Sequence, residues 1–391
     1  MSCHNKKIYK RLPFSVYFWS VAVIAFSGLI VSIYLSISHY RVYTDIGYSS
    51  FCAISRAINC DTISQSPYSI LWGVPVPVWG IIGYTFFLLF LPLAKMKETA
   101  NARIWSLLFL VALGFSLYSI VLALISNFYI HSYCIMCVLT YGINLLLLYM
   151  SWIIIRRFGT TGIIKGIITD FVFLITHRKK CLSLFMPFFI IALIVILFIP
   201  EYWVYAAPTL PAKIQTGITN EGHPWIGAEV PELVIEEFSD YQCFQCKKMH
   251  FYLRRLVTEY PEKIRLVHRN YPLDHEFNPV VVPEPYHVGS GKLALISIAA
   301  MTDNKFWEIN DLLFAESRKK NALNVKELAE SVNMDYRILL RGISDQEVRQ
   351  KLSFDVWEGM KLRLTGTPGY LINGKLYTGL IPSEILNAVM E

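Results

Sequence analysis

Five long stretches without a charged residue constrain this chain more than any other feature of its sequence. They cover residues 14–38, 72–94, 104–130, 138–155 and 182–200. The hydrocarbon core of a bilayer is about 30 Å thick and a helix rises about 1.5 Å per residue, so each stretch is long enough to cross it. Because 54% of the 391 residues are hydrophobic and 17% are charged, we expect a membrane part joined to a globular part.

The first stretch has a competing interpretation as a cleaved signal peptide. Such a peptide typically has an apolar core of about 7 to 15 residues and a cleavage site made of small residues. Residues 14–38 are longer and carry no such site. We therefore expect the first span to be retained.

The basic residues between the stretches predict how the chain is oriented. Segments 1–13, 95–103 and 156–181 together hold thirteen Lys and Arg, whereas the loop 39–69 holds two. By the positive-inside rule the three basic segments face the cytoplasm, and five spans then place everything after residue 205 on the opposite side. The same pattern accounts for the net charge of +7 and argues against a nucleic-acid partner.

Six of the eight cysteines fall into three close pairs, and all three pairs come out on the non-cytoplasmic side. The pairs are Cys52 with Cys60, Cys134 with Cys137, and Cys243 with Cys246. Cys3 and Cys181 have no partner at useful spacing and are interpreted as unreactive cytoplasmic thiols.

Cys134 and Cys137 stand at the head of the fourth span. At this spacing the two thiols share one helical face, and Ser132 is expected to cap the helix, so that the helix dipole favours a thiolate. A redox pair at the membrane rim suits a lipid-soluble electron acceptor. The alternative is that both are buried cysteines that behave as small hydrophobic residues.

Cys52 and Cys60 lie in the polar loop that follows the first span. One interpretation is a static disulfide that closes the loop. The other is a shuttle that passes electrons to Cys134 through mixed disulfides. Ser66 is interpreted either as a hydrogen-bonding residue of the same pocket or as an exposed loop serine.

The soluble part begins with a Pro- and Gly-rich tether over residues 206–230. A strand over 232–239, Cys243 and Cys246 at the start of a helix lasting to about 260, and a strand over 263–268 are typical of a thioredoxin-like redox motif. Helical patterns then cover about 291–363 before a strand and turn near 365–374.

Cys243, first in its motif, is the expected nucleophile, and Cys246 is the expected resolving thiol. Half of a zinc site with His250 is the alternative, but a second ligand pair is missing nearby. Thr367 and Pro368 form either an ordinary turn or a cis-proline turn beside the exposed sulfur. The remaining histidines are interpreted as surface or packing residues.

Two resemblances cover most of residues 14–391. The membrane part resembles the vitamin K epoxide reductase family in Cys52 and Cys60, Ser66, Trp72-Gly73-Val74-Pro75 and Cys134-Ile135-Met136-Cys137. The soluble part resembles the thioredoxin-fold DsbA-like oxidoreductases in Cys243-Phe244-Gln245-Cys246, Lys305-Phe306-Trp307-Glu308 and Gly366-Thr367-Pro368. The order of the parts is that of bacterial fusion homologues of the reductase.

The resemblance implies a fold class and a set of domains. A membrane all-α bundle with a four-helix core and one tethering helix precedes a soluble α/β thioredoxin-fold domain with a helical insertion. The expected boundaries are a cytoplasmic N-terminus over 1–13, a four-helix domain over 14–157, a surface helix and fifth span over 158–205, a linker over 206–230 and a thioredoxin-like domain over 231–391.

The resemblance also implies an activity. Cys243 and Cys246 oxidise reduced exported proteins, Cys52 and Cys60 reoxidise them, Cys60 pairs transiently with Cys134, and Cys137 reduces a quinone, either ubiquinone or menaquinone. Pro368 is expected to be cis, with Thr367 beside it, and Ser66 to line the quinone pocket. The enzyme is expected in the bacterial inner membrane, with its cysteine pairs on the periplasmic side.

One departure from the relatives and two other functions stay open. Many relatives have proline after the first cysteine of the soluble motif, where this chain has Phe244, and the residues between the cysteines tune the redox poise. A quinol-driven disulfide reductase or isomerase uses the same dithiols in reverse. A membrane-anchored module with structural cysteines is not an enzyme at all.

Overall fold

The computed structural model describes residues 12–55, 57–94, 104–159, 162–205, 214–316 and 323–390. The chain divides into two compact units, Met1–Glu201 and Tyr202–Glu391. The first is helical and the second is built around a sheet, so the predicted fold class is confirmed. The basic N-terminus, the loop 95–103 and Cys3 lie outside the described residues.

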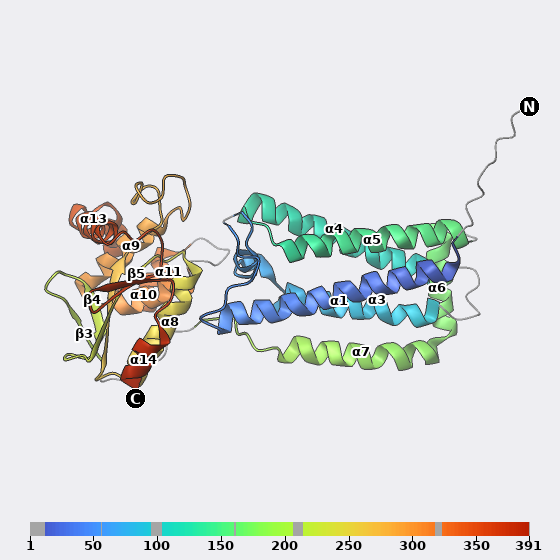
Figure 1. The fold of residues 1–391 in the computed structure, drawn as a ribbon, viewed down its shortest axis with the longest axis horizontal. Coiled ribbons are helices and arrows are strands. Elements are labelled where there is room, and N and C mark those ends of the chain that lie inside the picture. Colours follow the sequence, from blue (N-terminus) through green and yellow to red (C-terminus); the bar gives the residue numbers. More distant parts are fainter. Residues whose placement is uncertain are drawn as a thin grey trace, which may run out of the picture. The chain divides into compact units, whose positions relative to one another are not determined.

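Five helices of the described residues are long and apolar enough to cross a membrane. They are α1 (Phe14–Thr44), α3 (Val76–Ala94), α4 (Trp105–Ile125, continued by the π-helical turn η3 at Ser126–Ile130), α5 (Ile135–Phe158) and α7 (Arg178–Phe198). Helices α1, α3, α4 and α5 pack side by side (Figure 1), around a core that includes Val21, Phe87, Leu108 and Leu147. The apolar face of α7 is largely exposed, as expected of a helix that contacts lipid.

Helix α1 continues beyond Ser38, where the expected span ended. Its last turns carry polar side chains that become buried through contacts with the following loop. His39 Nε2 lies 3.2 Å from Ser69 Oγ, and the Tyr43 hydroxyl donates to the Ser64 carbonyl at 3.1 Å. Hydropathy cannot predict this extension, because it depends on residues that the loop brings back over the helix.

The expected surface helix between the fourth and fifth spans is α6 (Ile163–Thr176), and it also holds the start of α4. Ile104, at the N-cap position of α4, has no side-chain acceptor for the free amides of the first turn. Asp170 of α6 supplies one, because its Oδ2 accepts from the backbone N–H of Ser106 at 2.9 Å and of Leu107 at 3.2 Å. A carboxylate at a helix N-terminus is stabilising.

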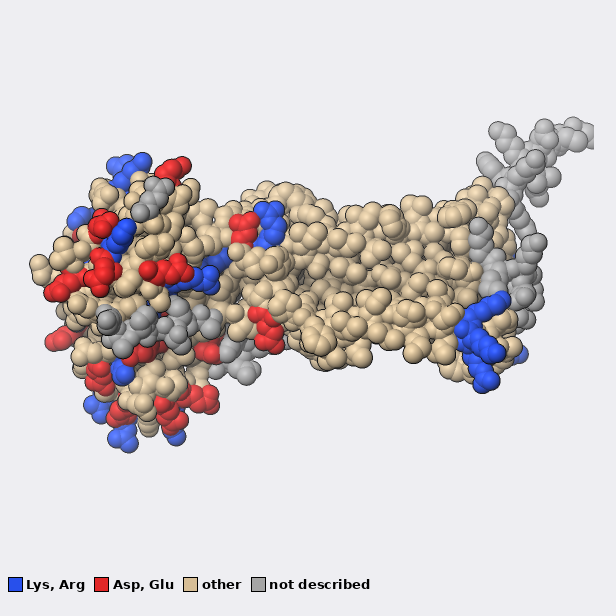
Figure 2. Space-filling view, turned by 90° about the horizontal axis from the view of Figure 1, so that it is seen from below, with Lys and Arg blue, Asp and Glu red and all other residues tan. Residues whose placement is uncertain are grey.

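Basic side chains gather at one end of the membrane unit (Figure 2). Arg156 and Arg157 end α5, and Arg178 begins α7. The short elements that carry the cysteine loop lie at the opposite end of the same bundle: α2 (Cys60–Ser64), η1 (Pro67–Ser69), β1 (Ile70–Leu71) and β2 (Val74–Pro75).

The soluble unit contains a six-stranded sheet with the order β3-β4-β6-β5-β7-β8. The strands are β3 (Gln215–Ile218), β4 (Pro224–Gly227), β5 (Leu233–Ser239), β6 (Ile264–Asn270), β7 (Gly369–Ile372) and β8 (Lys375–Thr378). Strands β5 and β6 are parallel and joined through α8 (Phe244–Glu259), while the other neighbours are antiparallel. The dithiol therefore lies at the carboxyl end of a central strand, where α/β sheets usually place their sites.

Helices between β6 and β7 form the expected insertion and close the core around Phe238, Leu295 and Phe314. They are α9 (Ser290–Ala299), η4 (Ala300–Asp303), α10 (Phe306–Glu316), α11 (Val325–Ser331), α12 (Tyr336–Ser344) and α13 (Gln346–Lys361), and α14 (Ser383–Met390) ends the described chain.

The segment predicted to be a linker, 206–230, contains the strands β3 and β4. Residues 206–213 lie outside the described part, but Ile226 of β4 is buried and pairs with Leu266 of the central strand β6. Pro224 opens β4 and Gly227 ends it with a φ of +117°, positions where a strand tolerates both residues. The Pro and Gly signals that predicted a tether thus mark the ends of a strand.

Candidate active site

Cys134 and Cys137 form a dithiol at the start of α5, but the cap differs from the expected one. Cys134 itself is the N-cap, and its sulfur accepts from the Cys137 backbone N–H at 3.2 Å. Ser132 cannot cap because the chain is still extended there, with Tyr133 paired to Ile58. The hydrogen bond from the Cys137 thiol lowers the pKa of the Cys134 thiol, against burial, which raises it. Cys134 is thus the thiol prepared for exchange.

The loop pair, Cys52 and Cys60, forms a disulfide directly beside this dithiol. The sulfur atoms of Cys52, Cys60 and Cys134 all lie within 4.8 Å of one another. The neighbouring backbone holds this arrangement, because Asn59 N–H donates to the Tyr133 carbonyl at 2.9 Å. Asn59 also caps α2 through its side chain. Three sulfurs this close together are the arrangement that thiol–disulfide exchange requires.

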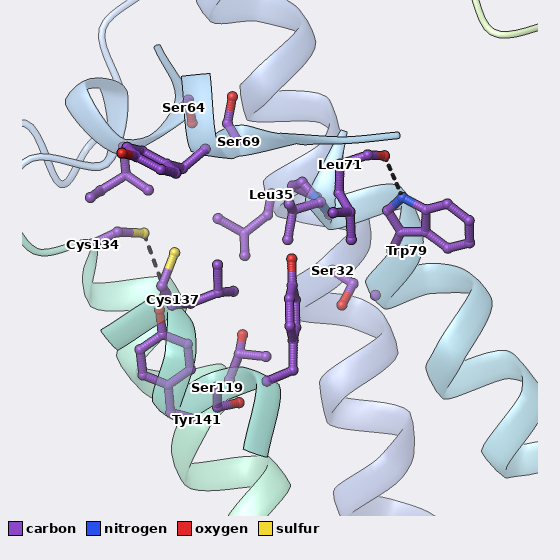
Figure 3. Close-up of a pocket in the computed structure, with 18 of the residues that line it drawn as sticks. Ser32, Leu35, Ser64, Ser69, Leu71, Trp79, Ser119, Cys134, Cys137 and Tyr141 are labelled. Carbon is purple, nitrogen blue, oxygen red and sulfur yellow. Dashed lines mark hydrogen bonds between the residues drawn. The ribbon is translucent and has the colours of Figure 1, made fainter. Parts of the chain in front are cut away.

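A cavity of about 320 Å³ opens next to these sulfurs, between α1, α3, α4 and α5 and under the loop. Cys134 and Cys137 lie on one side of it, and Leu35, Leu71 and Trp79 contribute apolar wall (Figure 3). Ser66 also lines it, and its hydroxyl donates to the Ile63 carbonyl at 2.8 Å. The described lining residues include no Asp, Glu, Lys or Arg.

Neutral hydrogen-bonding groups are placed within this apolar wall. The Tyr84 hydroxyl donates to Asn144 Oδ1 at 2.6 Å, and Asn144 Nδ2 donates to Ser119 Oγ at 2.9 Å. Tyr141 and His39 also line the cavity. An apolar cavity with neutral hydrogen-bonding groups suits an uncharged, largely apolar ligand.

Cys243 and Cys246 repeat the cap geometry of the membrane dithiol. Cys243 is the N-cap of α8, and its sulfur accepts from the Cys246 N–H at 3.2 Å. Burial raises the pKa of the Cys243 thiol, but hydrogen bonding from Cys246 and the charge of His287 outweigh burial and lower this pKa to about 7. Burial and the neighbouring Cys243 raise the pKa of Cys246. These opposite shifts match an attacking and a resolving thiol.

The Thr367–Pro368 peptide bond is cis, as the resemblance implied. The Cys243 sulfur lies 3.5 Å from the Thr367 carbonyl oxygen. Thr367 therefore borders the Cys243 sulfur, on the turn that precedes β7.

A buried charged cluster lies behind the dithiol, and the sequence did not predict it. Glu237 of β5 accepts from His268 Nδ1 at 2.9 Å and lies 3.4 Å from His250 Nδ1. Burial raises the pKa of Glu237, but the two histidines outweigh burial and lower it to about 2. His250 Nε2 lies 2.6 Å from Asp311, which also binds Arg254. His250 thus contacts two carboxylates, and these contacts explain its buried position without a role as a zinc ligand.

Two kinds of site residue escaped the sequence reasoning. Tyr84 and Asn144 carry no local pattern that separates them from other polar residues of a span. His250 was considered only as a zinc ligand and His268 only as a surface or packing residue, yet both are fully buried and paired with carboxylates. The acidic residue in a buried strand, Glu237, was the one available signal, because a buried charge requires partners.

Two families match the chain. The vitamin K epoxide reductase family matches residues 19–152, and a thioredoxin family matches residues 219–391. Among curated proteins, the chain is 25% identical over 162 residues to Na(+)/H(+) antiporter NhaA 3 of Salinispora tropica and 26% identical to NhaA 1 of Salinispora arenicola. Each alignment covers 41% of this chain, which spans 23% of the length of these relatives.

Solved structures similar to this chain include a thioredoxin-like oxidoreductase and the protein BdbD. A thioredoxin-like oxidoreductase from Silicibacter pomeroyi is 24% identical, with a TM-score of 0.37, over 44% of this chain and 91% of that one. Oxidised BdbD from Bacillus subtilis is 17% identical, with a TM-score of 0.36, over 45% of this chain and 96% of that one.

The two family matches support a disulfide oxidoreductase, and the five apolar helices suggest membrane insertion. Each match contains the cysteines of one described site. The chain therefore joins a vitamin K epoxide reductase family domain, over residues 19–152, to a thioredoxin-like domain over residues 219–391.

Proposed function

We propose that this protein is an integral-membrane thiol:quinone oxidoreductase that forms disulfide bonds in exported proteins. The observation that carries the proposal is the proximity of the Cys52, Cys60 and Cys134 sulfurs, within 4.8 Å of one another, beside an apolar cavity that Cys137 also lines. A structural disulfide alone does not require a third, free thiol at this distance. A quinone supplies an acceptor for two electrons and two protons when it occupies such a cavity.

The first step takes place in the soluble domain. The Cys243 and Cys246 disulfide oxidises a substrate dithiol: a substrate thiolate attacks Cys243, Cys246 leaves, and the second substrate thiol then releases Cys243. The substrate gains a disulfide and the domain becomes a dithiol. The lowered pKa of Cys243 makes it a good leaving group in this release.

The second step returns the soluble dithiol to its disulfide at the expense of the loop pair. Both units belong to one chain, so this exchange is intramolecular, with an effective concentration of about millimolar for a short flexible connection. Cys52 and Cys60 then carry the two electrons.

The third step transfers the electrons within the membrane unit. The Cys60 thiolate attacks Cys134 of a Cys134–Cys137 disulfide, and Cys137 leaves as a thiolate. Cys52 then attacks Cys60 and releases Cys134, which restores the loop disulfide and leaves a reduced helix dithiol. The structure contains the Cys52–Cys60 disulfide and free thiols at Cys134 and Cys137. Cys137, which lines the cavity, is the proposed electron donor, and closure of the Cys134–Cys137 disulfide completes the cycle.

The orientation in the proposal rests on the charges of the membrane unit. Basic side chains gather at one end of the membrane unit (Figure 2). Arg156 and Arg157 lie in the last turn of α5, at the end opposite its N-cap Cys134, and the positive-inside rule assigns that end to the cytoplasm. Arg41, near the cysteine loop, pairs with Asp45 at 2.8 Å. We therefore propose the inner membrane of a bacterium, with the cysteine pairs in the periplasm and either ubiquinone or menaquinone as the acceptor.

The proposal is tested by anaerobic quinone reduction with the full chain reconstituted in lipid and supplied with a reduced, unfolded protein. Wild type is expected to form quinol and substrate disulfides together. Cys137→Ala is expected to form no quinol, whereas Cys181→Ala, which removes a thiol outside the three pairs, is expected to behave as wild type. Quinol formation by Cys137→Ala at the wild-type rate contradicts the proposal.

A matched experiment tests the direction. Quinol and an oxidised substrate replace quinone and the reduced substrate, and the quinol-driven reductase predicts faster turnover in this direction. Activity of neither kind in wild type favours the non-enzymatic module.

A further inference from the structure

The soluble dithiol lacks a charge between its cysteines, but a histidine from a distant part of the chain lies beside it. Phe244 and Gln245 separate Cys243 from Cys246, and neither is charged. His287 belongs to the segment between β6 and α9, and its side chain is 13% exposed. The sequence gives no sign that this histidine belongs to the site.

Asp240 links His287 to the cysteine. His287 Nδ1 lies 3.1 Å from Asp240 Oδ1, and the same oxygen accepts from the Cys243 backbone N–H at 3.2 Å. Asp240 is fully buried at the turn between β5 and α8, so its charge requires a partner. The imidazole, the carboxylate and the start of the cysteine helix thus form one cluster.

The segment that carries His287 is fixed directly after this residue, at Val288, Gly289 and Ser290. Gln242 Nε2 donates to the Val288 carbonyl at 2.9 Å, which joins the segment to the cysteine turn. Asp274 Oδ2 accepts from the Gly289 N–H at 2.8 Å, and Asp240 Oδ2 accepts from the Ser290 hydroxyl at 2.8 Å. Gly289 has a φ of +90°, which lets the chain turn into α9 directly after His287. The position of His287 is therefore built into the fold.

The charges around Cys243 oppose one another. The Asp240 carboxylate disfavours a thiolate, while a protonated His287 favours it and also offsets Asp240. Cys246, Asp274 and Tyr286 are the other titratable groups that face this cluster from α8 and from the same segment. Without His287, the part of the chain that the structure describes places no cation in an ion pair with Asp240, so this buried carboxylate faces the nucleophile unbalanced.

We propose that His287 is a positioning residue that stabilises the Cys243 thiolate from outside the motif, in place of a cation between the two cysteines. It exchanges no electrons and forms no bond with substrate. Stabilising the thiolate stabilises the dithiol form over the disulfide, so His287 makes the domain a stronger oxidant. The inference deepens the proposed function, because it addresses how a motif with two uncharged central residues gains oxidising power.

The test is the pH profile of Cys243 alkylation in the full chain, fully reduced and anaerobic, with iodoacetamide as the probe and peptide mass spectrometry as the readout. We expect His287→Gln to slow alkylation at pH 6 by about threefold to tenfold, because loss of a nearby cation raises a thiol pKa. We expect His287→Lys, which keeps a positive charge, to stay within about twofold of wild type. The disulfide–dithiol equilibrium with glutathione at pH 7 should move about twofold toward the disulfide in His287→Gln only.

His275→Gln is the matched control. His275 lies in the same segment and its Nδ1 contacts the Val282 carbonyl at 2.8 Å, so this variant disturbs the segment without touching Asp240. The proposal is overturned if the profile of His287→Gln coincides with wild type, if His287→Lys shifts as far as His287→Gln, or if His275→Gln shifts equally. His287→Asn replaces His287→Gln if the latter does not fold. No quinone takes part, so these outcomes are independent of the membrane steps.

Discussion

The two Cys-x-x-Cys dithiols of this protein share one backbone geometry and differ in everything around it. In each, the first cysteine is the N-cap of a helix and accepts from the N–H of the second at 3.2 Å. Cys134 borders a cavity without a charged wall, beside a disulfide. Cys243 stands beside Asp240 and His287 and in front of a buried charged cluster.

In both places the Cys-x-x-Cys motif supplies a nucleophilic thiol. We propose that the residues around each motif determine whether it reacts with a protein thiol or with a membrane-soluble acceptor. An apolar cavity with neutral donors suits an uncharged acceptor that arrives through the membrane. Cys243, whose sulfur borders the Thr367 carbonyl, is the cysteine that we propose to exchange with a protein substrate.

Removing one cysteine from each dithiol should give opposite defects. We expect Cys243→Ala to lose substrate oxidation by at least about a thousandfold, because no nucleophile remains for the covalent step. The same variant should still reduce quinone when a small dithiol reductant supplies the loop pair directly. Cys137→Ala should oxidise about two equivalents of substrate, one for each disulfide that remains, and then stop. An assay of substrate disulfides measures the first half-reaction, and quinol absorbance measures the second. If each variant loses both half-reactions equally, the two dithiols do not have the separate roles proposed here.

Glu237→Gln should destabilise the soluble domain and leave the membrane unit unchanged. A neutral side chain leaves His250 and His268 facing a weaker partner, so we expect a loss of about 3 kcal/mol, or about 6 to 12 °C in the thermal midpoint of this domain. The exposed Glu221→Gln is the control and should shift by less than about 2 °C.

The effect of Glu237→Gln should depend on pH. The pKa of Glu237 is about 2 in the folded domain against an ordinary value of 4.5, so its contribution is present above pH 4.5 and is lost as the pH falls toward 2. The difference in the free energy of unfolding between wild type and Glu237→Gln should therefore shrink as the pH falls from 4.5 toward 2. Calorimetry at several pH values checks this, and a constant gap contradicts the assignment.

Exchange at Cys243 should follow its thiolate. Because its pKa is lowered to about 7, the rate should rise about tenfold per pH unit below 7 and level off above it. Stopped-flow mixing of the reduced full chain with an oxidised model peptide measures this rate. A midpoint near pH 9 would be that of an ordinary thiol and would contradict the electrostatic stabilisation of the Cys243 thiolate.

The smallest expected effect concerns the cavity wall. Tyr84→Phe removes the hydroxyl that donates to Asn144, and we expect KM for quinone to rise about threefold to tenfold with little change in kcat. Tyr149→Phe alters an exposed tyrosine of α5 and serves as the control. Steady-state quinol formation distinguishes the two, and an equal KM in both variants removes Tyr84 from the quinone site.

The sequence was informative where the signal is local. Long uncharged stretches predicted the five spans, and the strand, dithiol and helix pattern predicted the start of the thioredoxin-like domain. The ends of elements were less accurate, since the extension of α1 depends on contacts of His39 and Tyr43 with the loop. Strand β4 was missed because its Pro and Gly suggest a loop until its pairing with β6 is known.

The site was predictable in its cysteines and not in its surroundings. Spacing identified the pairs, but the approach of Cys134 to the loop disulfide depends on the pairing of Ile58 with Tyr133. Tyr84, Asn144 and His287 reach their sites only through tertiary structure. The helix cap is Cys134 and not the predicted Ser132, because the chain stays extended through Tyr133. Local residue propensities do not predict this extended segment.

In the proposed function, electrons travel from the soluble dithiol through the loop pair to the dithiol at the cavity. The most direct measurement adds one equivalent of quinone to the fully reduced, anaerobic protein and follows each disulfide by rapid acid quench, alkylation and mass spectrometry. The account predicts that Cys134–Cys137 appears first, Cys52–Cys60 second and Cys243–Cys246 last, with all three absent in Cys137→Ala. Formation of Cys243–Cys246 before the membrane pairs, or at the wild-type rate in Cys137→Ala, contradicts it.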